Sequence, residues 1–468
     1  MTRSSVKYIF IVLVAGSAVL SCKVSKTYQQ PDINTNALYR DQSTTDTATI
    51  ASMLWQSLFT DTALKALIKE GLDHNLDLKV AVQKIVEAQA TLGQTKGALF
   101  PGLSANASVS PSKQSAAALN FPPGININTT TTLYQLSLSS SWEVDIWGKL
   151  SSAKRSAFAN LLQTDAAKRA IQTQLIADIA NNYYNLLALD KELDITSQTL
   201  QNRVKDVETM KTLKEAAVVN GAAVVQSEAN RYAAEVAIPD IKRSIRETEN
   251  ALDILLGRAP GPINRGKLDD QKPITDLQTG VSSQLLKNRP DVQQAEYGFR
   301  SAFENTNVAH AYFYPSFTIT ASGGFSNLTL KDFFINSIFY NIAAGLTQPI
   351  FNQGINKARL KTAQAQQKEA MYNYQKTVLT AGGEVSNALY SYNSAAEKGG
   401  ARHKQIAALE KAVDYTQQLL RYSSATNYTD VLTSEQSLLA AQLSGVNDKL
   451  QQLQAIVNLY RALGGGWR

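Results

Sequence analysis

Very few side chains in this sequence have the chemistry of catalysis or metal binding. There is one cysteine among 468 residues, which excludes an internal disulfide and a cysteine-based zinc site. The three histidines, His74, His310 and His403, are too far apart in the sequence to form a local metal-binding motif. The paired carboxylates Asp269 and Asp270 stand in a polar segment, without a nucleophile motif or a phosphate-binding loop beside them. The sequence therefore predicts no enzyme, no metal ion and no other cofactor.

The single cysteine follows a short apolar run near the start of the chain. Arg3 and Lys7 precede the run Tyr8–Leu20, which is shorter than the ~20 residues that cross a bilayer as a helix. This pattern is typical of a secretory signal peptide, and its end at Cys22 is similar to a bacterial lipoprotein processing site. We expect residues 1–21 to be removed and Cys22 to carry lipid. A plain signal peptide with an incidental cysteine is the alternative.

The composition narrows the class of protein further. Hydrophobic residues make up 44% of the chain, which is enough to bury a core, whereas charged residues make up only 18%. Although the net charge is +7, no block rich in lysine or arginine stands out, so the sequence does not predict nucleic-acid binding. After the signal segment, no apolar stretch is long enough for a transmembrane helix. Any crossing of a membrane is therefore expected to use β-strands.

The same pattern occurs twice along the chain. Asn75–Leu78 corresponds to Arg289–Val292, and Val224–Glu228 corresponds to Val431–Glu435. Each copy predicts a helix, two strands, a long helix and a return helix. The expected long and return helices are 151–217 with 222–256, and 353–421 with 429–463. The expected divisions are a signal peptide (1–21), a lipid-anchored extended segment (22–57), a first repeat (58–257), a linker (258–281), a second repeat (282–463) and a tail (464–468).

Four segments alternate between apolar and polar side chains and have the length of tilted transmembrane strands, about ten residues. They are 103–110, 134–143, 316–325 and 340–347. Aromatic residues gather near their ends, as in the girdle of a membrane barrel: Phe100, Trp142, Trp147, Tyr312, Phe313, Tyr314, Phe339, Tyr340 and Phe351. The same alternation suits a soluble antiparallel sheet with one wet face, and this alternative stays open. The connecting loops, 111–131 and 326–336, are expected to be short and polar.

The predicted helices favour the membrane alternative. Leu186, Leu193, Leu200 and Val207 recur every seven residues, a pattern that predicts a coiled-coil seam. The helix that carries them would be about 100 Å long. Gly382-Gly383 and Gly399-Gly400 are expected to bend or interrupt the second long helix. Because bacterial barrels begin at about eight strands, four strands in one chain predict an oligomer, and three chains would supply enough for a water-filled passage.

Five stretches of the sequence resemble the TolC-like outer-membrane factors, in particular the lipoprotein branch that works with resistance-nodulation-division efflux pumps. They are Leu58–Asp61, Ser141–Lys149, Leu285–Val292, Gln348–Asn352 and Leu459–Trp467. The resemblance implies an α+β membrane protein with an internal two-fold repeat. It also implies a homotrimeric 12-stranded outer-membrane β-barrel, four strands per chain, that continues into a long α-helical coiled-coil barrel in the periplasm of a Gram-negative bacterium.

The resemblance also implies partners and a function. The expected function is that of the outer-membrane exit duct of a tripartite efflux pump, with a periplasmic adaptor protein and an inner-membrane transporter as partners. An exit duct of a type I protein secretion system and a periplasmic coiled-coil scaffold lipoprotein are the alternatives. The transported substrate stays open, and antibiotics, dyes, detergents, metal ions and signalling molecules are all compatible with the sequence.

Functional residues are expected where each long helix turns back. The resemblance places a glycine in each turn, where an adaptor docks, and this sequence has Ala217 and Ser424 at those positions. The candidate adaptor contacts are Ala217, Asn220, Gly221, Ser424 and Asn427. The candidate residues of a periplasmic gate are Thr426, Tyr428 and Asp430, and the alternative for Asp430 is a helix cap. Arg289-Pro290-Asp291 is interpreted as a helix start and Gly464–Gly466 as a helix stop.

Overall fold

The computed structural model describes residues 24–35, 38–40, 46–115, 128–274, 277–422 and 428–468. They form two compact units. One unit comprises the chain up to Asp32 with Ile85–Gln163 and Ala295–Asn373, and contains all four described strands. The other comprises Ile33–Lys84, Thr164–Gln294 and Tyr374–Arg468, and is helical.

Each half of the chain contains the predicted succession of a helix, two strands, a long helix and a return helix, from α4 in the first half and from α9 in the second. The first half contains η1 (Ile50–Ser52), α2 (Trp55–Leu58), α3 (Thr62–His74), α4 (Leu76–Gly97), β1 (Gly102–Lys113), β2 (Thr130–Val144), α6 (Lys149–Glu215) and α7 (Gly221–Leu256). The second half contains η2 (Leu268–Asp270), η3 (Ser282–Gln284), α8 (Leu285–Asn288), α9 (Pro290–Ala311), β3 (Ser316–Asn327), β4 (Ile338–Thr347), α10 (Ile355–Tyr422) and α11 (Tyr428–Ala462). The single helix predicted at the start of the first repeat is divided into α3 and α4, because Asn75 ends α3 and its side chain caps α4 through the backbone N–H of Leu78.

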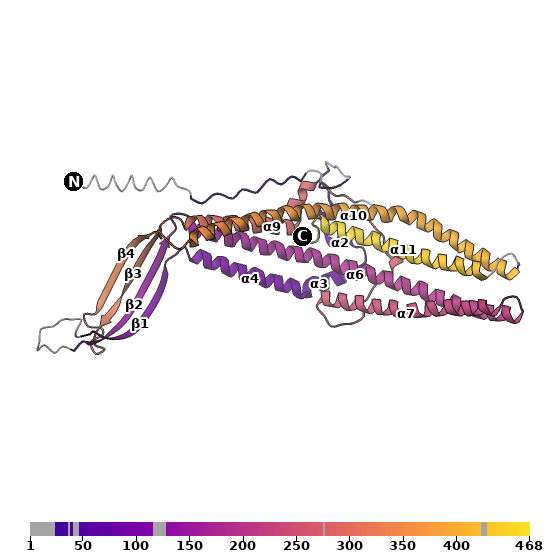
Figure 1. Cartoon of the computed structure of the whole chain (residues 1–468), viewed down its shortest axis with the longest axis horizontal. Helices are drawn as coiled ribbons and strands as arrows, with labels where there is room; N and C mark the ends of the chain where they lie inside the picture. Colours follow the sequence, from indigo (N-terminus) through magenta and orange to yellow (C-terminus); the bar gives the residue numbers. More distant parts are fainter. Residues whose placement is uncertain (1–23, 36–37, 41–45, 116–127, 275–276, 423–427) are drawn as a thin grey trace. The chain divides into compact units, whose positions relative to one another are not determined.

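The four strands form one antiparallel sheet in the order β1-β2-β3-β4 (Figure 1). The pairing register of the strands places most of their apolar side chains on one face of the sheet. Leu138, for example, pairs with Ala105 of β1 and Gly323 of β3, and Ala321 pairs with Ile342 of β4. Since side chains of paired residues lie on the same side of a sheet, the apolar members of all four strands share a face. That face is exposed, with Leu103 and Ile342 each at 74%.

The opposite face of the sheet is polar and almost uncharged. The hydroxyls of Ser104 and Ser139 lie 2.7 Å apart, and the Asn106 amide donates to Ser139 Oγ at 3.3 Å. Within the four strands as described, only Lys113 and Glu143 carry charge, and each lies at or next to a strand end. This face therefore offers hydroxyl and amide groups to water without a strong field.

The prediction of a polar loop between the last two strands is wrong. The β3–β4 loop, Leu328–Ser337, exposes Leu328, Leu330, Phe334 and Ile335. The apolar residues stand in the middle of the loop, between Asn327 and Asn336. The loop 116–127, which joins the first two strands, lies outside the described residues.

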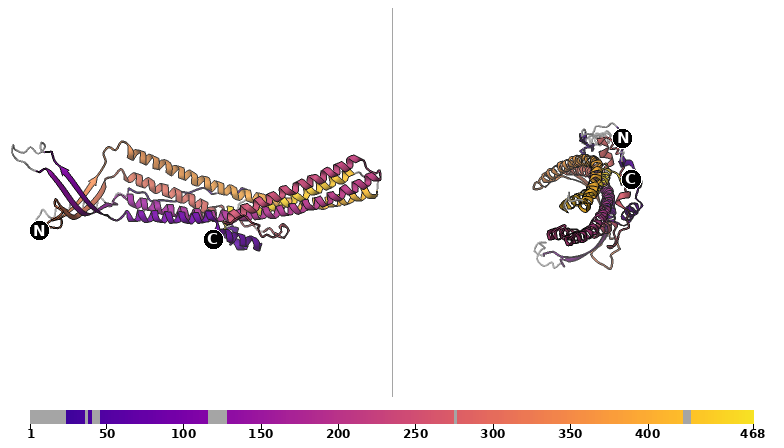
Figure 2. Two further views of the ribbon diagram at one scale, coloured as in Figure 1. Left: turned by 90° about the horizontal axis from the view of Figure 1, so that it is seen from below. Right: turned by 90° about the vertical axis from the view of Figure 1, so that its right-hand side faces the viewer.

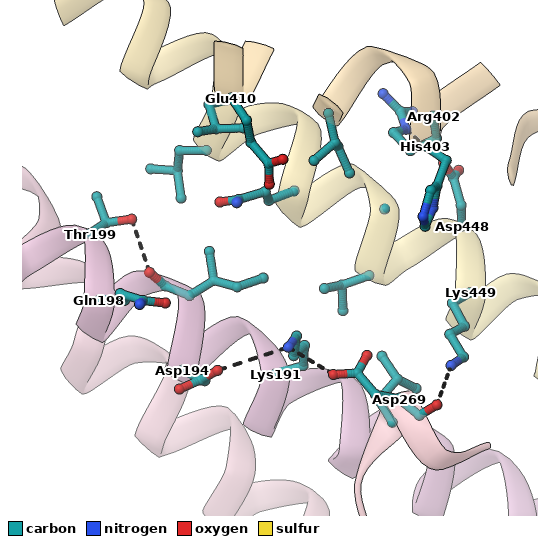
Figure 3. Close-up of a pocket in the computed structure, with 18 of the residues that line it drawn as sticks. Lys191, Asp194, Gln198, Thr199, Asp269, Arg402, His403, Glu410, Asp448 and Lys449 are labelled. Carbon is teal, nitrogen blue, oxygen red and sulfur yellow. Dashed lines mark hydrogen bonds and ion pairs between the residues drawn. The ribbon is translucent and has the colours of Figure 1, made fainter. Parts of the chain in front are cut away.

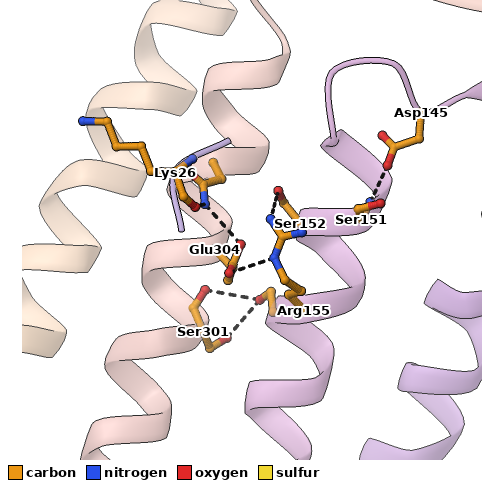
Figure 4. Close-up of polar contacts among 9 residues, drawn as sticks. Lys26, Asp145, Ser151, Ser152, Arg155, Ser301 and Glu304 are labelled. Carbon is orange, nitrogen blue, oxygen red and sulfur yellow. Dashed lines mark hydrogen bonds and ion pairs between the residues drawn. The ribbon is translucent and has the colours of Figure 1, made fainter. Parts of the chain in front are cut away.

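Side-chain caps fix the start of the first long helix, where β2 ends (Figure 4). Both carboxylate oxygens of Asp145 accept hydrogen bonds from the first turn of α6, from the N–H of Leu150 and of Ser151, each at 2.8 Å. One turn later, Arg155 forms an ion pair with Glu304 of α9 at 2.9 Å. The side chain of Asn307 of α9 bonds twice to the backbone of Lys26 in the N-terminal segment: its oxygen accepts from the Lys26 N–H, and its amide donates to the Lys26 carbonyl. The start of α6 is therefore bonded to α9 beside the sheet.

In the helical unit, the long helices run in pairs, α6 beside α7 and α10 beside α11 (Figures 1 and 2). Its core contains Ile68 of α3, Ile179 and Tyr183 of α6, and Leu252 of α7, each fully buried. The predicted seam is partly correct, because Leu186 and Val207 are buried. None of the helices in the described part of the chain combines the length and the hydrophobicity needed to cross a membrane.

The motif Arg289-Pro290-Asp291 opens α9, as predicted, and also holds three helices together. The guanidinium of Arg289 is buried, forms ion pairs with Asp291 and with Glu384 of α10 at 2.8 Å, and donates to the carbonyl of Ala462 at 2.8 Å. Gly464, just after α11, has φ +89°, and a Cβ there would meet the carbonyl oxygen of Asn288 at 2.5 Å. Glycine is therefore required at this helix stop.

Of the bend or interruption predicted at the glycine pairs, the interruption is wrong, because α10 is continuous from Ile355 to Tyr422, whereas the bend stays a prediction. At the first pair the reason is packing. A Cβ on Gly382 would meet both the Cβ and the carbonyl oxygen of Leu38 at 3.0 Å, whereas a Cβ on Gly383 would meet nothing within 4 Å. Gly382 thus allows the N-terminal segment to lie against α10. Glycine has a lower helix propensity than alanine, but alanine would not fit at this contact.

This difference predicts opposite effects for two neighbouring substitutions. Gly382→Ala should destabilise the protein by about 1–3 kcal/mol, because the added methyl group overpacks against Leu38. Gly383→Ala should stabilise it by up to about 1 kcal/mol through helix propensity alone. Denaturant unfolding of the two variants and the parent measures both effects, and equal shifts would refute the packing role of Gly382.

Candidate functional site

The turn between α6 and α7 contains three of the predicted contact residues. Ala217 has φ +56°, in the left-handed region that favours glycine. The N–H of Val218 donates to the Leu213 carbonyl at 2.9 Å and that of Ala217 to the Lys214 carbonyl at 3.0 Å, the two bonds of a Schellman helix end. Ala217 thus occupies the backbone geometry of the glycine that the resemblance places here, at a cost in strain.

The other two residues of this turn have different surroundings. Asn220 caps α7, because its side-chain oxygen accepts from the N–H of Ala223 at 3.2 Å. Gly221 begins α7, and a Cβ there would meet nothing within 4 Å, so packing does not require glycine. The space around Gly221 is open to a docking partner. Ser424, Thr426 and Asn427, predicted in the second turn, lie outside the described residues, as does Cys22.

Tyr428 and Asp430 lie in the first turn of α11 in contrasting environments. Tyr428 is 6% exposed and packs with Met210 of α6, Val224 of α7 and Leu432 of α11. Burial raises the pKa of its hydroxyl. Asp430 is exposed, near the positive end of the α11 dipole. Of the two described gate candidates, only Asp430 therefore presents its side chain to solvent in this chain.

A buried ionic cluster lies between α6, α10 and α11, near the helix turns. The sequence did not predict it. Arg203 of α6 is 3% exposed and pairs with Glu435 of α11 and, at 3.7 Å, with Asp206. Glu435 also accepts a hydrogen bond at 2.9 Å from Gln417 of α10. Burial, together with the charge of Glu435, raises the pKa of Asp206 to about 7. We call Arg203, Asp206, Gln417 and Glu435 the tip cluster; it joins three helices.

A cavity of about 780 Å³ is lined by residues of α6, α10 and α11, among them Arg203, Gln417 and Glu435 of the tip cluster. Figure 3 shows part of its wall, including Lys191, Asp269 and Lys449. Several of the charged side chains on its walls have partners within the chain. Lys191 reaches Asp269 at 2.9 Å, Arg402 reaches Asp448 at 2.8 Å, and Lys449 donates to the backbone carbonyl of Asp269. Burial lowers the pKa of Lys449. Because these cations have partners within the chain, the cavity has the character of an interface between packed helices rather than of a ligand site.

Comparison with known proteins identifies the family to which this sheet and these paired long helices belong. A family model described as outer membrane efflux protein matches residues 67–258 and 281–465. The chain belongs to this family. Its members are transporters of the outer membrane rather than enzymes, and the predicted outer-membrane location and efflux function are confirmed.

Individual relatives agree with the family. The chain is 28% identical over 416 residues to the probable outer membrane lipoprotein SilC of Salmonella typhimurium, which covers 88% of each chain. It is 29% identical over 475 residues to the toluene efflux pump outer membrane protein TtgC of Pseudomonas putida, covering 100% of this chain and 96% of TtgC. The open-state structure of the Neisseria gonorrhoeae outer membrane channel MtrE superposes with a TM-score of 0.84 at 26% identity, covering 96% of this chain and 99% of MtrE. The predicted architecture, mostly helical with four strands per chain, is confirmed.

Proposed function

We propose that three copies of this chain form a 12-stranded β-barrel in the outer membrane, continued by a periplasmic tunnel of coiled-coil helices. The observation that carries the proposal is the sheet. Its apolar face is exposed, and the outer edges of β1 and β4 have no partner strand among the described residues. Unpaired backbone groups in lipid cost several kcal/mol each, so β4 of one copy pairs with β1 of the next. A periplasmic scaffold protein, which is surrounded by water, would not be expected to expose an apolar face of this kind.

The polar face of the sheet then lines the passage. A hollow of about 380 Å³ on the sheet is lined in part by the hydroxyl and amide groups of Ser104, Ser139, Ser141, Thr320, Ser322 and Asn341. A lumen with hydroxyl and amide groups and little charge passes solutes without strong selection by charge. In this proposal the barrel conducts passively, and selection of the substrate belongs to the inner-membrane transporter of the resistance-nodulation-division type.

The remaining expectations complete the proposal. The chain is an internal two-fold repeat, supported by the two separate matches of one family model and by the equal order of elements. Its repeats are 58–257 and 282–463, joined by the linker 258–281. Cys22 carries lipid, supported by the name of SilC as a lipoprotein. A periplasmic adaptor contacts the helix turns at Ala217, Asn220, Gly221, Ser424 and Asn427.

One measurement tests both the assembly and the anchor. Intact mass spectrometry of the purified protein in mild detergent should give the mass of three chains, each beginning at Cys22 and carrying acyl groups. A stable assembly of any other copy number would overturn the barrel of twelve strands. A free thiol on Cys22, or cleavage at another residue, would overturn the anchor and leave the barrel intact.

We also propose that Asp430, repeated three times around the axis, narrows the periplasmic mouth and attracts cations there. Asp430→Ala should raise single-channel conductance in planar bilayers or reduce cation selectivity. Asp414→Ala is the control, because Asp414 is exposed on α10 and accepts a hydrogen bond from Gln418 one turn away. Unchanged conductance and selectivity in Asp430→Ala would remove this residue from the gate. Thr426 and Tyr428 would then be left as candidates.

A further inference from the structure

The β3–β4 loop has a fixed conformation, which its own polar groups maintain. The backbone N–H of Ser326 donates to the carbonyl of Ser337 at 2.8 Å and closes the loop. Inside it, the Asn327 side-chain amide donates to the carbonyl of Asp332 at 2.7 Å, and the N–H of Ile335 donates to the same carbonyl at 2.8 Å. Such bonds hold the loop backbone in place, so the direction in which its side chains point is a property of the fold.

The loop folds onto the apolar face of the sheet. Phe325 lies on that face, because it pairs with Leu136 of β2 and Ile338 of β4. The ring of Phe334 meets the ring of Phe325 edge to face at a centroid distance of 5.1 Å, and the Phe333 ring lies 6.2 Å from it. The two loop rings are 4.9 Å apart. These distances and tilts are those of favourable aromatic pairs.

This cluster leaves much apolar surface uncovered. Leu330, Phe334 and Ile335 are each more than 60% exposed, and they continue the exposed row formed by Ile338 and Tyr340 of β4. Monomeric soluble proteins rarely expose a patch of this kind, and such patches mark contacts with membranes or with other proteins. The loop lies at the strand ends away from α9 and α10, the end that carries the extracellular loops in outer-membrane barrels.

We infer that the β3–β4 loop inserts Leu330, Phe334 and Ile335 into the hydrocarbon of the outer leaflet and anchors the rim of the barrel there. The inference rests on the proposed lipid-facing role of the sheet, of which the loop is a continuous extension. A neighbouring copy is a poorer occupant, because the rings lie over the face of β3, whereas copies would meet at the outer edges of β1 and β4. Lys331, also exposed, is placed to reach the phosphate groups of the lipid surface.

Accessibility of a spin label tests the inference. In a Cys22→Ser background, single cysteines replace Phe334, Ile342 on the apolar face of β4, and Lys331, and each is labelled with a nitroxide. The full-length protein is reconstituted into vesicles of phosphatidylethanolamine and phosphatidylglycerol. Collision rates with oxygen, which concentrates in hydrocarbon, and with a water-soluble nickel complex are then compared. We expect position 334 to match position 342 in its preference for oxygen, and position 331 to prefer nickel.

Each contrary result is informative. A preference for nickel at 334, with a preference for oxygen kept at 342, places the loop in water and overturns the inference alone. Low collision rates with both reagents at 334 mean that protein covers the loop, which also overturns it. A preference for nickel at 342 overturns the lipid-facing role of the sheet itself. Leu330→Cys repeats the test at a side chain outside the ring cluster, in case replacement of Phe334 loosens the loop.

Discussion

Replacing Ile319 with arginine should strongly weaken the assembled protein in lipid. Ile319 lies near the middle of β3 and pairs with Trp142 and Ala344, on the apolar face. A charged side chain on the lipid face at the bilayer midplane costs about 2–4 kcal/mol in each chain, and the trimer would bear this cost three times. The fraction of trimer that survives denaturant in vesicles, read from gels run without boiling, measures the loss.

The neighbouring residue is the matched control. Thr318 pairs with Glu143 and Gly345 on the polar face, so an arginine there would point into the passage and toward a carboxylate. Thr318→Arg should leave the trimer nearly as stable as the parent. Equal tolerance of both substitutions would mean that β3 does not meet hydrocarbon, and the barrel would have to be abandoned.

Period-two alternation predicted the strands, and a simple physical reason explains why it did not predict the register. Alternation in one strand shows that Ile319 and Thr318 point to opposite sides, but not which residues of the next strand share a side with them. The register supplies this information and places residues such as Phe325, Ile342 and Leu346 on one face. The long helices were predicted within a few residues, because their periodicity is local and no proline interrupts the expected spans of α6 and α10.

Long-range contacts account for what the sequence analysis missed. The sequence predicts a bend or an interruption of the helix at Gly382, because the contact with Leu38, which is distant in the chain, leaves no local signal. The pair Arg203 and Glu435 is separated by 232 positions, although Glu435 belongs to the repeated motif Val431–Glu435. Glu228 is the equivalent residue in the first repeat, and its carboxylate lies 4.0 Å from the Lys211 ammonium on the surface. The repeat therefore did not predict that Glu435 is buried. Charge pairing across such distances leaves no periodic signal.

Removing the charge of Arg203 should open the helix turns. Arg203→Met leaves Glu435 and Asp206 facing each other in a buried site, and the loss of one partner from a buried ion pair costs about 3–5 kcal/mol. Hydrogen exchange in the first turns of α11 should accelerate, and single-channel conductance should rise. Adding Asp206→Asn and Glu435→Gln to Arg203→Met should restore most of the protection, since no charge is then left unpaired.

An exposed ion pair provides the control for Arg203. Arg243 and Glu247 lie one turn apart on α7, with side chains 63% and 62% exposed. Arg243→Met should change stability by less than about 0.5 kcal/mol, because solvent screens such pairs. If the two arginine variants behave alike, the tip cluster does not hold the turns together.

The raised pKa of Asp206 also gives the turns a dependence on pH. In the folded protein the raised pKa lets this carboxyl keep its proton up to about pH 7, whereas in an unfolded chain it loses the proton near the ordinary aspartate pKa of 3.8. Between these values the folded state binds the extra proton, so the contribution of Asp206 to stability is complete below about pH 4 and is lost as the pH rises through 7. Conductance should therefore be higher at pH 8 than at pH 5, and Asp206→Asn should abolish most of this difference. A pH response that persists unchanged in Asp206→Asn would assign it to another group, and a response of opposite sign would mean that ionised Asp206 strengthens the cluster through Arg203.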